Sequence, residues 1–323
     1  MPKLDKIGFF ANLIGAGTNH GYGYSAVQLI EAWQNQGVPV WWGDLEAPLG
    51  FNFVQPHGYE YTIDRVNIGY TPWESTKLPD AWPYYMNKMT EIWTTSYACK
   101  EWFKQAGIEK PIRVLHHGIN KEHWPSKLRK RKKKEPFKFL HVGEPSFRKG
   151  GKTAYEAFKK IYGNKKEFLL VLKGQPSFEI DIDNVFVIDG TLTQYDLMRL
   201  HHKCHAMIYP TQGEGFGLIP LQAAATGMPT LVTAWSGPLD YIEYCYPLEV
   251  EDIIECDYEP HEGTWALPSR EHLEQWMQWV VQEQKYAFQD SYETSRNMDH
   301  YWSWDYQATI SLNWFRELLL DFS

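Results

Sequence analysis

The chain has 323 residues, of which 43% are hydrophobic and 16% aromatic. This composition excludes an intrinsically disordered protein, and because one core rarely serves more than about 250–300 residues, we expect two domains. The formal net charge of −8 argues against a protein that binds nucleic acid over its whole surface. No apolar run reaches the roughly 20 residues of a membrane-spanning helix, so any membrane contact is expected to be peripheral.

The first part of the chain has the pattern of a β-α-β unit. An apolar strand over 7–11 precedes a glycine-rich loop over 14–23, and a helix is expected over 24–36, with Gly37 ending it. A second strand is expected over 38–42. This order is typical of a parallel sheet.

Strands and helices continue to alternate up to residue 126. A weaker strand is expected over 61–70 and a further one over 91–95, after which Ser96 caps a helix over 97–106. The segment 113–120 completes this half. We therefore place an N-terminal Rossmann-like domain at residues 1–126.

A basic run follows the first domain. It contains Lys127, Arg129, Lys130, Arg131, Lys132, Lys133 and Lys134. With Pro136 after it, the run predicts a solvated inter-domain linker over 127–136. Contact of this run with nucleic acid or with an anionic membrane is the alternative.

The second half repeats the alternation. Strands are expected over 137–143, 168–173, 185–188 and 206–209, and helices after Gly151 and over 195–203. We place a second Rossmann-like domain at residues 137–300. An amphipathic helix over 301–323 is expected to pack back on the N-terminal domain.

The most informative stretch is 210–233, which has the pattern strand end, glycine-rich loop, small-residue helix and strand. Its glycines allow a sharp turn, so that free amides at the start of the helix, around 216–218, can face a phosphate. Glu214 lies at the same turn, where its carboxylate can accept hydrogen bonds from sugar hydroxyls.

Several short motifs, in this order, resemble those of the retaining glycosyltransferases of family 4. They are Gly21-Tyr22-Gly23, Ile92-Trp93-Thr94-Thr95-Ser96, His117-Gly118-Ile119-Asn120, Arg148-Lys149-Gly150, Lys173-Gly174, Glu214-Gly215-Phe216-Gly217-Leu218, Gly227-Met228-Pro229 and Ser303-Trp304-Asp305. The resemblance implies the α/β fold called GT-B: two doubly wound Rossmann-like domains that face a central cleft, with a C-terminal helix that crosses back to the first domain. It also implies that 1–126 is the acceptor-side domain and that 137–300 binds the nucleotide sugar.

The resemblance also implies an activity. Such an enzyme moves a sugar from a nucleotide diphosphate sugar to a hydroxyl acceptor with retention of anomeric configuration, and it uses neither a metal nor another cofactor. The implied catalytic residues are Arg148 and Lys173, which match a basic pair that binds the leaving diphosphate, and Glu214, which matches the first Glu of an E-x7-E motif.

The donor-binding residues implied by the resemblance come from both halves. They are Gly21, Tyr22, Gly23, Gly190, Thr191, Leu192, Gly215, Phe216, Gly217, Leu218 and Gln222. Gln222 departs from the family, because the second position of the motif is usually a Glu that accepts hydrogen bonds from the ribose. Gln keeps one carbonyl acceptor but loses the charge, so weaker ribose binding or altered nucleotide preference is expected.

The acceptor side shows a second departure, since many family members place a histidine there. This chain has Trp73 and Glu74 instead, and these two residues with His117 are the acceptor-side candidates. Trp73, Trp82 or Trp235 could stack on an acceptor, although the tryptophans mostly serve packing.

Two patterns that could indicate metal binding have simpler interpretations. His201, His202, Cys204 and His205 are expected to lie on an ordinary packed or solvated helix, and Asp181-Ile182-Asp183 spells Asp-x-Asp by coincidence in a polar loop. No metal site is therefore expected.

The acceptor class and the compartment complete the predictions. A glycan, a lipid-linked precursor, a small molecule or a modified base in DNA is possible as acceptor, and a catalytically idle nucleotide-sugar-binding module or a sugar phosphorylase is the alternative to a transferase. The four cysteines lack paired spacing and the sequence shows no secretory signal, so a cytoplasmic protein is expected.

Overall fold

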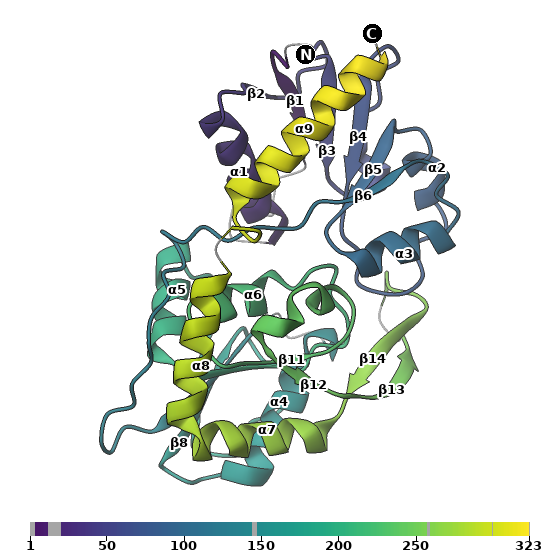
Figure 1. Cartoon of the computed structure of the whole chain (residues 1–323). Coiled ribbons are helices and arrows are strands. Elements are labelled where there is room, and N and C mark those ends of the chain that lie inside the picture. The colour runs from purple at the N-terminus through teal and green to yellow at the C-terminus, as the bar shows by residue number, and fades with distance from the viewer. Residues whose placement is uncertain (1–3, 12–20, 144–146, 257–258, 299, 323) are drawn as a thin grey trace. The chain divides into compact units, whose positions relative to one another are not determined.

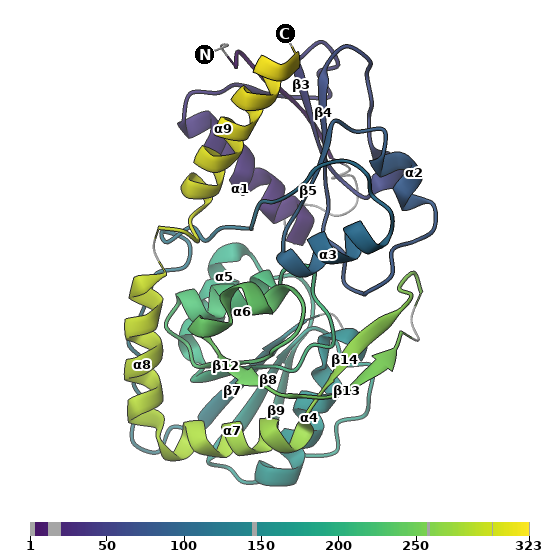
Figure 2. The same cartoon turned by 45° about the vertical axis from the view of Figure 1, so that its right-hand side comes forward.

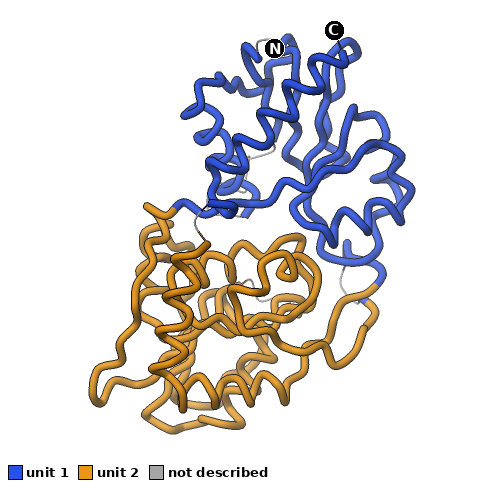
Figure 3. The backbone as a smooth tube through the Cα atoms, viewed as in Figure 1, with its two compact units in different colours: residues 1–120, 256–263, 300–323 blue, residues 121–255, 264–299 orange. Residues whose placement is uncertain are grey.

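The structure is a computed structural model that describes residues 4–11, 21–143, 147–256, 259–298 and 300–322. The chain forms two compact units (Figure 3). Unit 1 contains 1–120, 256–263 and 300–323, and unit 2 contains 121–255 and 264–299. Each unit is built around its own six-stranded sheet (Figure 1).

All strands of the unit 1 sheet are parallel, in the order β2-β1-β3-β4-β5-β6. The strands are β1 (Ile7–Phe10), β2 (Val40–Trp42), β3 (Leu49–Phe53), β4 (Val66–Tyr70), β5 (Glu91–Thr94) and β6 (Ile112–Val114). The helices are α1 (Gly21–Asn35), α2 (Trp82–Met86), α3 (Tyr97–Gln105) and α9 (Trp304–Phe322), with a short 3-10 turn at Pro56–Gly58. The expected strand over 61–70 begins only at Val66, and β3 was not expected.

The C-terminal helix α9 packs beside α1, as Figures 1 and 2 both show. Trp33 of α1 donates a hydrogen bond through Nε1 to Ser311 Oγ at 2.8 Å, and its ring meets Phe315. Phe315 in turn stacks on Trp93 of β5, with ring centroids 4.9 Å apart. Because Trp93 faces α9, its neighbour Ile92 faces the opposite side, where it packs with Phe103 of α3.

The unit 2 sheet is also parallel, in the order β12-β11-β10-β7-β8-β9. Its strands are β7 (Phe137–Val142), β8 (Phe168–Lys173), β9 (Val185–Ile188), β10 (Ala206–Tyr209), β11 (Thr230–Thr233) and β12 (Tyr246–Leu248). Its helices are α4 (Gly151–Tyr162), α5 (Gln194–Lys203), α6 (Leu218–Ala225), α7 (Arg270–Gln282) and α8 (Gln284–Asn297). Two 3-10 segments, Phe147–Lys149 and Gly237–Tyr244, and an antiparallel hairpin of β13 (Val250–Glu255) and β14 (Thr264–Pro268) complete the unit.

Side chains of the unit 2 strands alternate between two cores. Phe139 and Ile208 point to the face covered by α4, α7 and α8, whereas Leu140 and Met207 point to the face covered by α5 and α6. Strands with both faces buried require nearly continuous apolar runs. This explains why β10, whose four residues are all buried, has the bounds expected from the sequence. The expected bounds of β8 and β9 also agree with the structure.

The segment 127–136 differs from the expected solvated linker, because it is part of unit 2 and contains a buried cation. Arg129 donates hydrogen bonds to the carbonyls of Cys204, Thr226 and His201 at 2.9–3.1 Å. The Thr226 hydroxyl accepts a further bond at 2.9 Å. Pairing a buried guanidinium with carbonyl oxygens offsets its desolvation, so this part of the run folds against the unit.

Candidate functional site

The strand order of unit 2 reverses between β7 and β10, which lie side by side although β8 and β9 come between them in the chain. In open parallel sheets such a reversal opens a crevice at the carboxyl ends of the strands, where ligands bind. The loops after β7 and β10 meet there. Gln212 N donates a hydrogen bond to Arg148 O at 2.8 Å, and Thr211 Oγ1 lies 3.1 Å from the same oxygen. Gly150 lies so close to the loop after β10 that an added Cβ would be 2.0 Å from Pro210 O.

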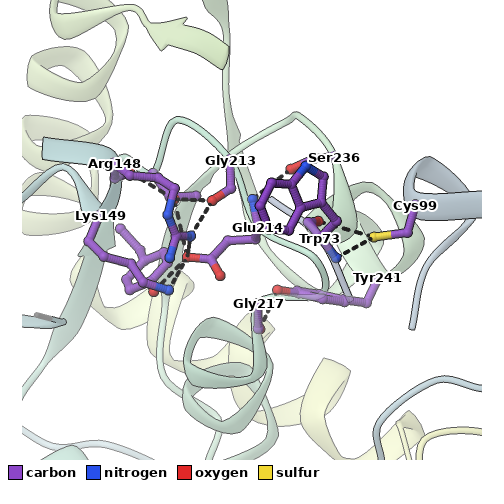
Figure 4. A network of polar contacts seen from close by, with 11 residues as sticks. Trp73, Cys99, Arg148, Lys149, Gly213, Glu214, Gly217, Ser236 and Tyr241 are labelled. Atoms are coloured by element: carbon purple, nitrogen blue, oxygen red, sulfur yellow. Dashed lines mark hydrogen bonds and ion pairs between the residues drawn. The ribbon is translucent and has the colours of Figure 1, made fainter. Parts of the chain in front are cut away.

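Glu214 lies at the centre of these loops (Figure 4) and is 5% exposed. Its Oε1 accepts hydrogen bonds from Lys149 Nζ at 2.6 Å, Tyr209 Oη at 3.0 Å and Thr211 Oγ1 at 3.2 Å. Arg148 Nη1 lies 3.6 Å from the same oxygen and donates to Gly213 O at 2.6 Å. The carboxylate is thus held in one orientation by cations and hydroxyl donors.

The charge state of Glu214 follows from these contacts. Burial raises the pKa of the carboxyl, but the positive charges of Lys149 and Arg148 and the hydrogen bonds outweigh burial, so the pKa lies below its usual value. Glu214 is therefore ionised at neutral pH. Two cations beside one carboxylate leave a net positive charge, which suits a diphosphate.

Lys149 was missed by the sequence analysis, which assigned the catalytic role to its neighbour Arg148. Both residues belong to the 3-10 turn Phe147–Lys149, and Lys149 makes the shorter ion pair with Glu214. The motif Arg148-Lys149-Gly150 contained both cations, but nothing in it indicated which one points at the carboxylate.

The loop between Glu214 and the start of α6 requires glycine at particular positions. Gly217 has a φ of +87°, and an added Cβ would lie 2.4 Å from Tyr241 Oη, which donates a hydrogen bond to Gly217 O at 2.6 Å. Glu214 N donates to Ser236 Oγ at 3.0 Å. Gly237 also requires glycine, since a Cβ there would meet Phe216 Cα at 2.5 Å. The first residues of α6, Leu218 and Ile219, have no carbonyl partner for their amides within the helix, and Pro220 has no amide hydrogen. An anion at this helix start stays a prediction.

His141 supports this arrangement from β7. Its Nδ1 donates a hydrogen bond to Ile208 O at 3.0 Å, and its ring stacks on Tyr209, which donates to Glu214. Burial and the nearby charge of Lys149 lower the pKa of His141 to about 4, so the ring is neutral. No motif in the sequence indicated this residue.

The other predicted donor residues of unit 2 lie at the same edge or on α6. Lys173 is the last residue of β8, and Gly190, Thr191 and Leu192 follow β9. Among the described residues, no hydrogen bond or ion pair links Lys173 to Glu214. Gly190 has a φ of +75° and open space around its Cβ position.

Gln222 is buried in α6, and its Oε1 has no hydrogen-bond partner among the residues that the structure describes. A buried amide oxygen without a partner is costly, so this acceptor is suited to a ligand donor.

Residues 12–20, which include most of the expected loop over 14–23, lie outside the described residues. Gly21, Tyr22 and Gly23 begin α1 rather than ending that loop. Tyr22 Oη lies 2.9 Å from Thr71 Oγ1, and burial and the charge of Glu74 raise its pKa.

His117 and Trp73 are packed within unit 1. Ser25 Oγ lies 3.3 Å from His117 Nδ1, and burial and the neighbouring His116 lower the pKa of His117 to about 3. Trp73 meets Trp82 and His261 edge-on or tilted, each with ring centroids 4.6 Å apart, and Cys99 Sγ donates a hydrogen bond to Trp73 O (Figure 4). Both tryptophans are buried, unlike a platform on which an acceptor stacks, whereas Glu74 and Trp235 are half-buried.

The histidines at the end of α5 have separate hydrogen-bond partners. His201 Nδ1 bonds to Leu197 O, His202 Nε2 to Pro125 O, and His205 Nδ1 accepts from Lys138 N, so the rings point to different partners. Asp181 forms an ion pair with Lys159 and accepts a hydrogen bond from Tyr155. Across the described ranges there is no group of three or more His, Cys, Asp or Glu side chains that could hold a metal. Nor does any helix in the described part have the length and apolar content to cross a membrane.

The residues around Glu214 lie in the part of the chain that is similar to known glycosyltransferases. Residues 122–244, which include the whole Glu214 cluster, match the family model described as Glycosyl transferases group 1. The glycogen synthase of Mycobacterium tuberculosis is 31% identical over 137 residues, covering 40% of this chain and 33% of the relative. The O-antigen chain mannosyltransferase RfbU of Salmonella typhimurium is 25% identical over 160 residues, covering 46% of this chain and 43% of the relative. The chain thus spans less than half the length of these two relatives.

Solved structures show the fold over nearly the whole chain. Sucrose-phosphate synthase from Thermosynechococcus elongatus superposes with a TM-score of 0.74 at 14% identity, covering 98% of this chain and 100% of that chain. Anabaena HepE, solved in complex with UDP and glucose, has a TM-score of 0.71 at 13% identity, covering 96% and 99%. The fold is GT-B, as the motif resemblance implied. The residues that match the model of Glycosyl transferases group 1 therefore include Glu214.

Proposed function

We propose that the protein is a retaining glycosyltransferase that moves a sugar from a nucleotide diphosphate sugar to a hydroxyl acceptor without a metal. The observation that carries the proposal is the ionised, buried Glu214 beside Lys149 and Arg148 at the strand-order reversal of unit 2. The group 1 match covers this cluster, and relatives that match over part of the chain are a glycogen synthase and a mannosyltransferase.

The cluster suits the chemistry of this reaction. The bond between the anomeric carbon and the phosphate oxygen breaks, a bond from that carbon to the acceptor oxygen forms on the same face, and the acceptor proton passes to the leaving diphosphate. Negative charge develops on the diphosphate, where Lys149, Arg148 and the first amides of α6 stabilise it. Glu214 fixes Lys149 and accepts hydrogen bonds from the sugar hydroxyls.

The donor class can be tested by binding. HepE was solved with UDP-glucose, so uridine diphosphate sugars are the first probes, with guanosine and adenosine diphosphate sugars beside them. A sugar nucleotide at about 100 times its dissociation constant stabilises a protein by about 2.7 kcal/mol. We expect a thermal shift with one nucleotide class. Gln222 is the residue proposed to form a hydrogen bond with the ribose.

The transferase proposal is distinguished from an idle binding module by turnover. A transferase releases nucleotide diphosphate from the stabilising donor, by transfer or by slow hydrolysis, whereas a binding module shows the thermal shift without release. The compartment proposed is the cytoplasm, because the four cysteines lack the paired spacing of a disulfide framework.

A further inference from the structure

The two arginines of the basic run bind carbonyl oxygens of unit 2. These contacts fix the backbone of the run, so its lysines have defined positions on the surface of unit 2. Arg129 is buried and donates to the carbonyls described above. Arg131 donates through Nε to Glu135 O at 2.8 Å and through Nη2 to Glu167 O at 3.4 Å. Figure 1 shows this segment as the blue-green loop at the lower left that leads toward β7.

A tight turn presents the lysines. Glu135 N donates to Lys132 O, and Lys132 N donates to Glu135 Oε2, both at 3.1 Å. Lys134 has a positive φ of 69°. The carboxylate of Glu135 also forms an ion pair with Lys138 at 2.6 Å. Glu135 therefore neutralises Lys138 and not the lysine side chains of the turn itself.

The turn before β8 adds cations from elsewhere in the chain. Phe137 N donates to Glu167 O at 2.8 Å, and Phe137 is paired with Phe168 in the sheet, so the starts of β7 and β8 are adjacent. The combined cluster, which we call the basic edge, consists of Lys130, Arg131, Lys132, Lys133, Lys134, Lys165 and Lys166. The lysines among them are exposed, and within the described residues none forms an ion pair. Glu167 is the exposed acid at the same place.

The basic edge lies at the opposite end of the strands from Glu214. It is at the amino ends of β7 and β8, whereas the Glu214 loops follow the carboxyl ends of β7 and β10. Six residues of β7 separate the two ends by about 20 Å. A partner at the basic edge therefore leaves the Glu214 loops of unit 2 uncovered.

We propose that the basic edge docks unit 2 on an anionic bilayer surface. The whole chain carries a formal charge of −8, so the rest of it is more acidic still and is repelled by the same surface, which orients the protein. Clusters of four to eight Lys and Arg residues bind anionic headgroups, and each adds about fivefold to the partition coefficient.

A nucleic acid is the less favoured partner because the basic edge offers no ring for base stacking. The aromatic side chains of its two turns, Phe137, Tyr162 and Phe168, pack on their neighbours; Tyr162 and Phe168 stack with centroids 3.9 Å apart. Proteins that hold single strands combine cations with exposed aromatic rings. The lysines here provide charge alone, as a headgroup surface requires.

The test is co-sedimentation with vesicles of phosphatidylcholine alone and of phosphatidylcholine with about one-third phosphatidylglycerol. We expect binding only to the anionic vesicles, and its loss when salt is raised from about 0.1 M to about 1 M, since the Debye length falls from about 10 Å to about 3 Å. The triple variant Lys132→Ser, Lys133→Ser, Lys134→Asn should partition about 100-fold more weakly. Asn is chosen at 134 because it tolerates positive φ.

The matched control removes three exposed lysines elsewhere, Lys88→Ser, Lys104→Ser and Lys152→Ser, and should bind anionic vesicles like the parent chain. Equal binding to both vesicle types, or equal loss in both triple variants, would overturn the proposal. Tighter binding to duplex DNA or RNA than to anionic vesicles at the same salt would also overturn it. Neither readout depends on sugar transfer.

Discussion

Lys149 Nζ lies 2.6 Å from Glu214 Oε1, although 65 positions separate the two residues in the chain. The contact exists because the loops after β7 and β10 meet where the strand order reverses. Glu214 holds the ammonium group of Lys149, the cation that we propose contacts the diphosphate.

Lys149→Ala should weaken the binding of nucleotide diphosphate at least about tenfold, because a charge-assisted contact to phosphate is lost. Titration calorimetry with the diphosphate identified by the thermal-shift panel measures this. Lys152→Ala removes an exposed lysine in the first turn of α4 and should leave affinity unchanged. Equal effects of the two substitutions would contradict the assigned role of Lys149.

Gly217→Ala should destabilise the protein by about 2–4 kcal/mol, because the new Cβ meets both a positive φ and Tyr241 Oη. Gly37→Ala is the matched control: its φ is +81°, but no atom lies within 4 Å, so only the backbone cost of about 1 kcal/mol is expected. Urea unfolding of each variant gives the comparison. Combining Gly217→Ala with Tyr241→Phe should recover part of the loss, and full additivity would argue against the steric explanation.

Arg129→Met should destabilise the protein by about 3–5 kcal/mol, because four carbonyls and one hydroxyl lose a donor. Lys130→Met, next to it in the chain but exposed, should change the free energy of unfolding by no more than about 0.5 kcal/mol. If both substitutions were equally mild, 127–136 would be the solvated linker expected from the sequence.

Buried histidines should make the protein less stable as the pH falls from about 6.5 to about 4. Burial lowers the pKa of His141 and of His201 to about 4, while the unfolded chain binds protons near 6.5. The unfolded state therefore gains protons first, and each histidine contributes stability that is complete above 6.5 and is lost as the pH falls toward 4. The loss is about 3 kcal/mol per histidine. Urea unfolding at several pH values should show a smaller slope for His201→Gln than for the parent chain; an equal slope would exclude His201 as a source.

Much of the fold follows from local sequence patterns, whereas the exceptions involve polar residues in buried positions. β8, β9 and β10 have the expected bounds because their apolar runs are short and continuous. β3 was missed because Gly50 and Asn52 interrupt its apolar pattern, yet both lie in a fully buried strand, where Asn52 Nδ2 donates to Ile68 O. That partner lies on another strand, so the sequence around Asn52 could not predict the hydrogen bond.

The site shows the same division. Glu214 and Gly217 could be predicted because turn glycines and an acid at a helix start form a local pattern. Lys149 could not be separated from Arg148, since the geometry of two loops decides which cation contacts the carboxylate. Arg129 resembles its lysine neighbours in sequence, and only the carbonyls of distant residues distinguish it.

The central claim is that the Glu214 cluster transfers a sugar from a nucleotide diphosphate sugar. Its most direct test is release of nucleotide diphosphate from the stabilising donor by the parent chain, by Glu214→Ala and by Glu179→Ala, an exposed acid outside the cluster. We expect release by the parent and by Glu179→Ala, and a fall of about 100-fold or more in Glu214→Ala, with circular dichroism confirming that all three are folded. Release that survives unchanged in folded Glu214→Ala would contradict the account.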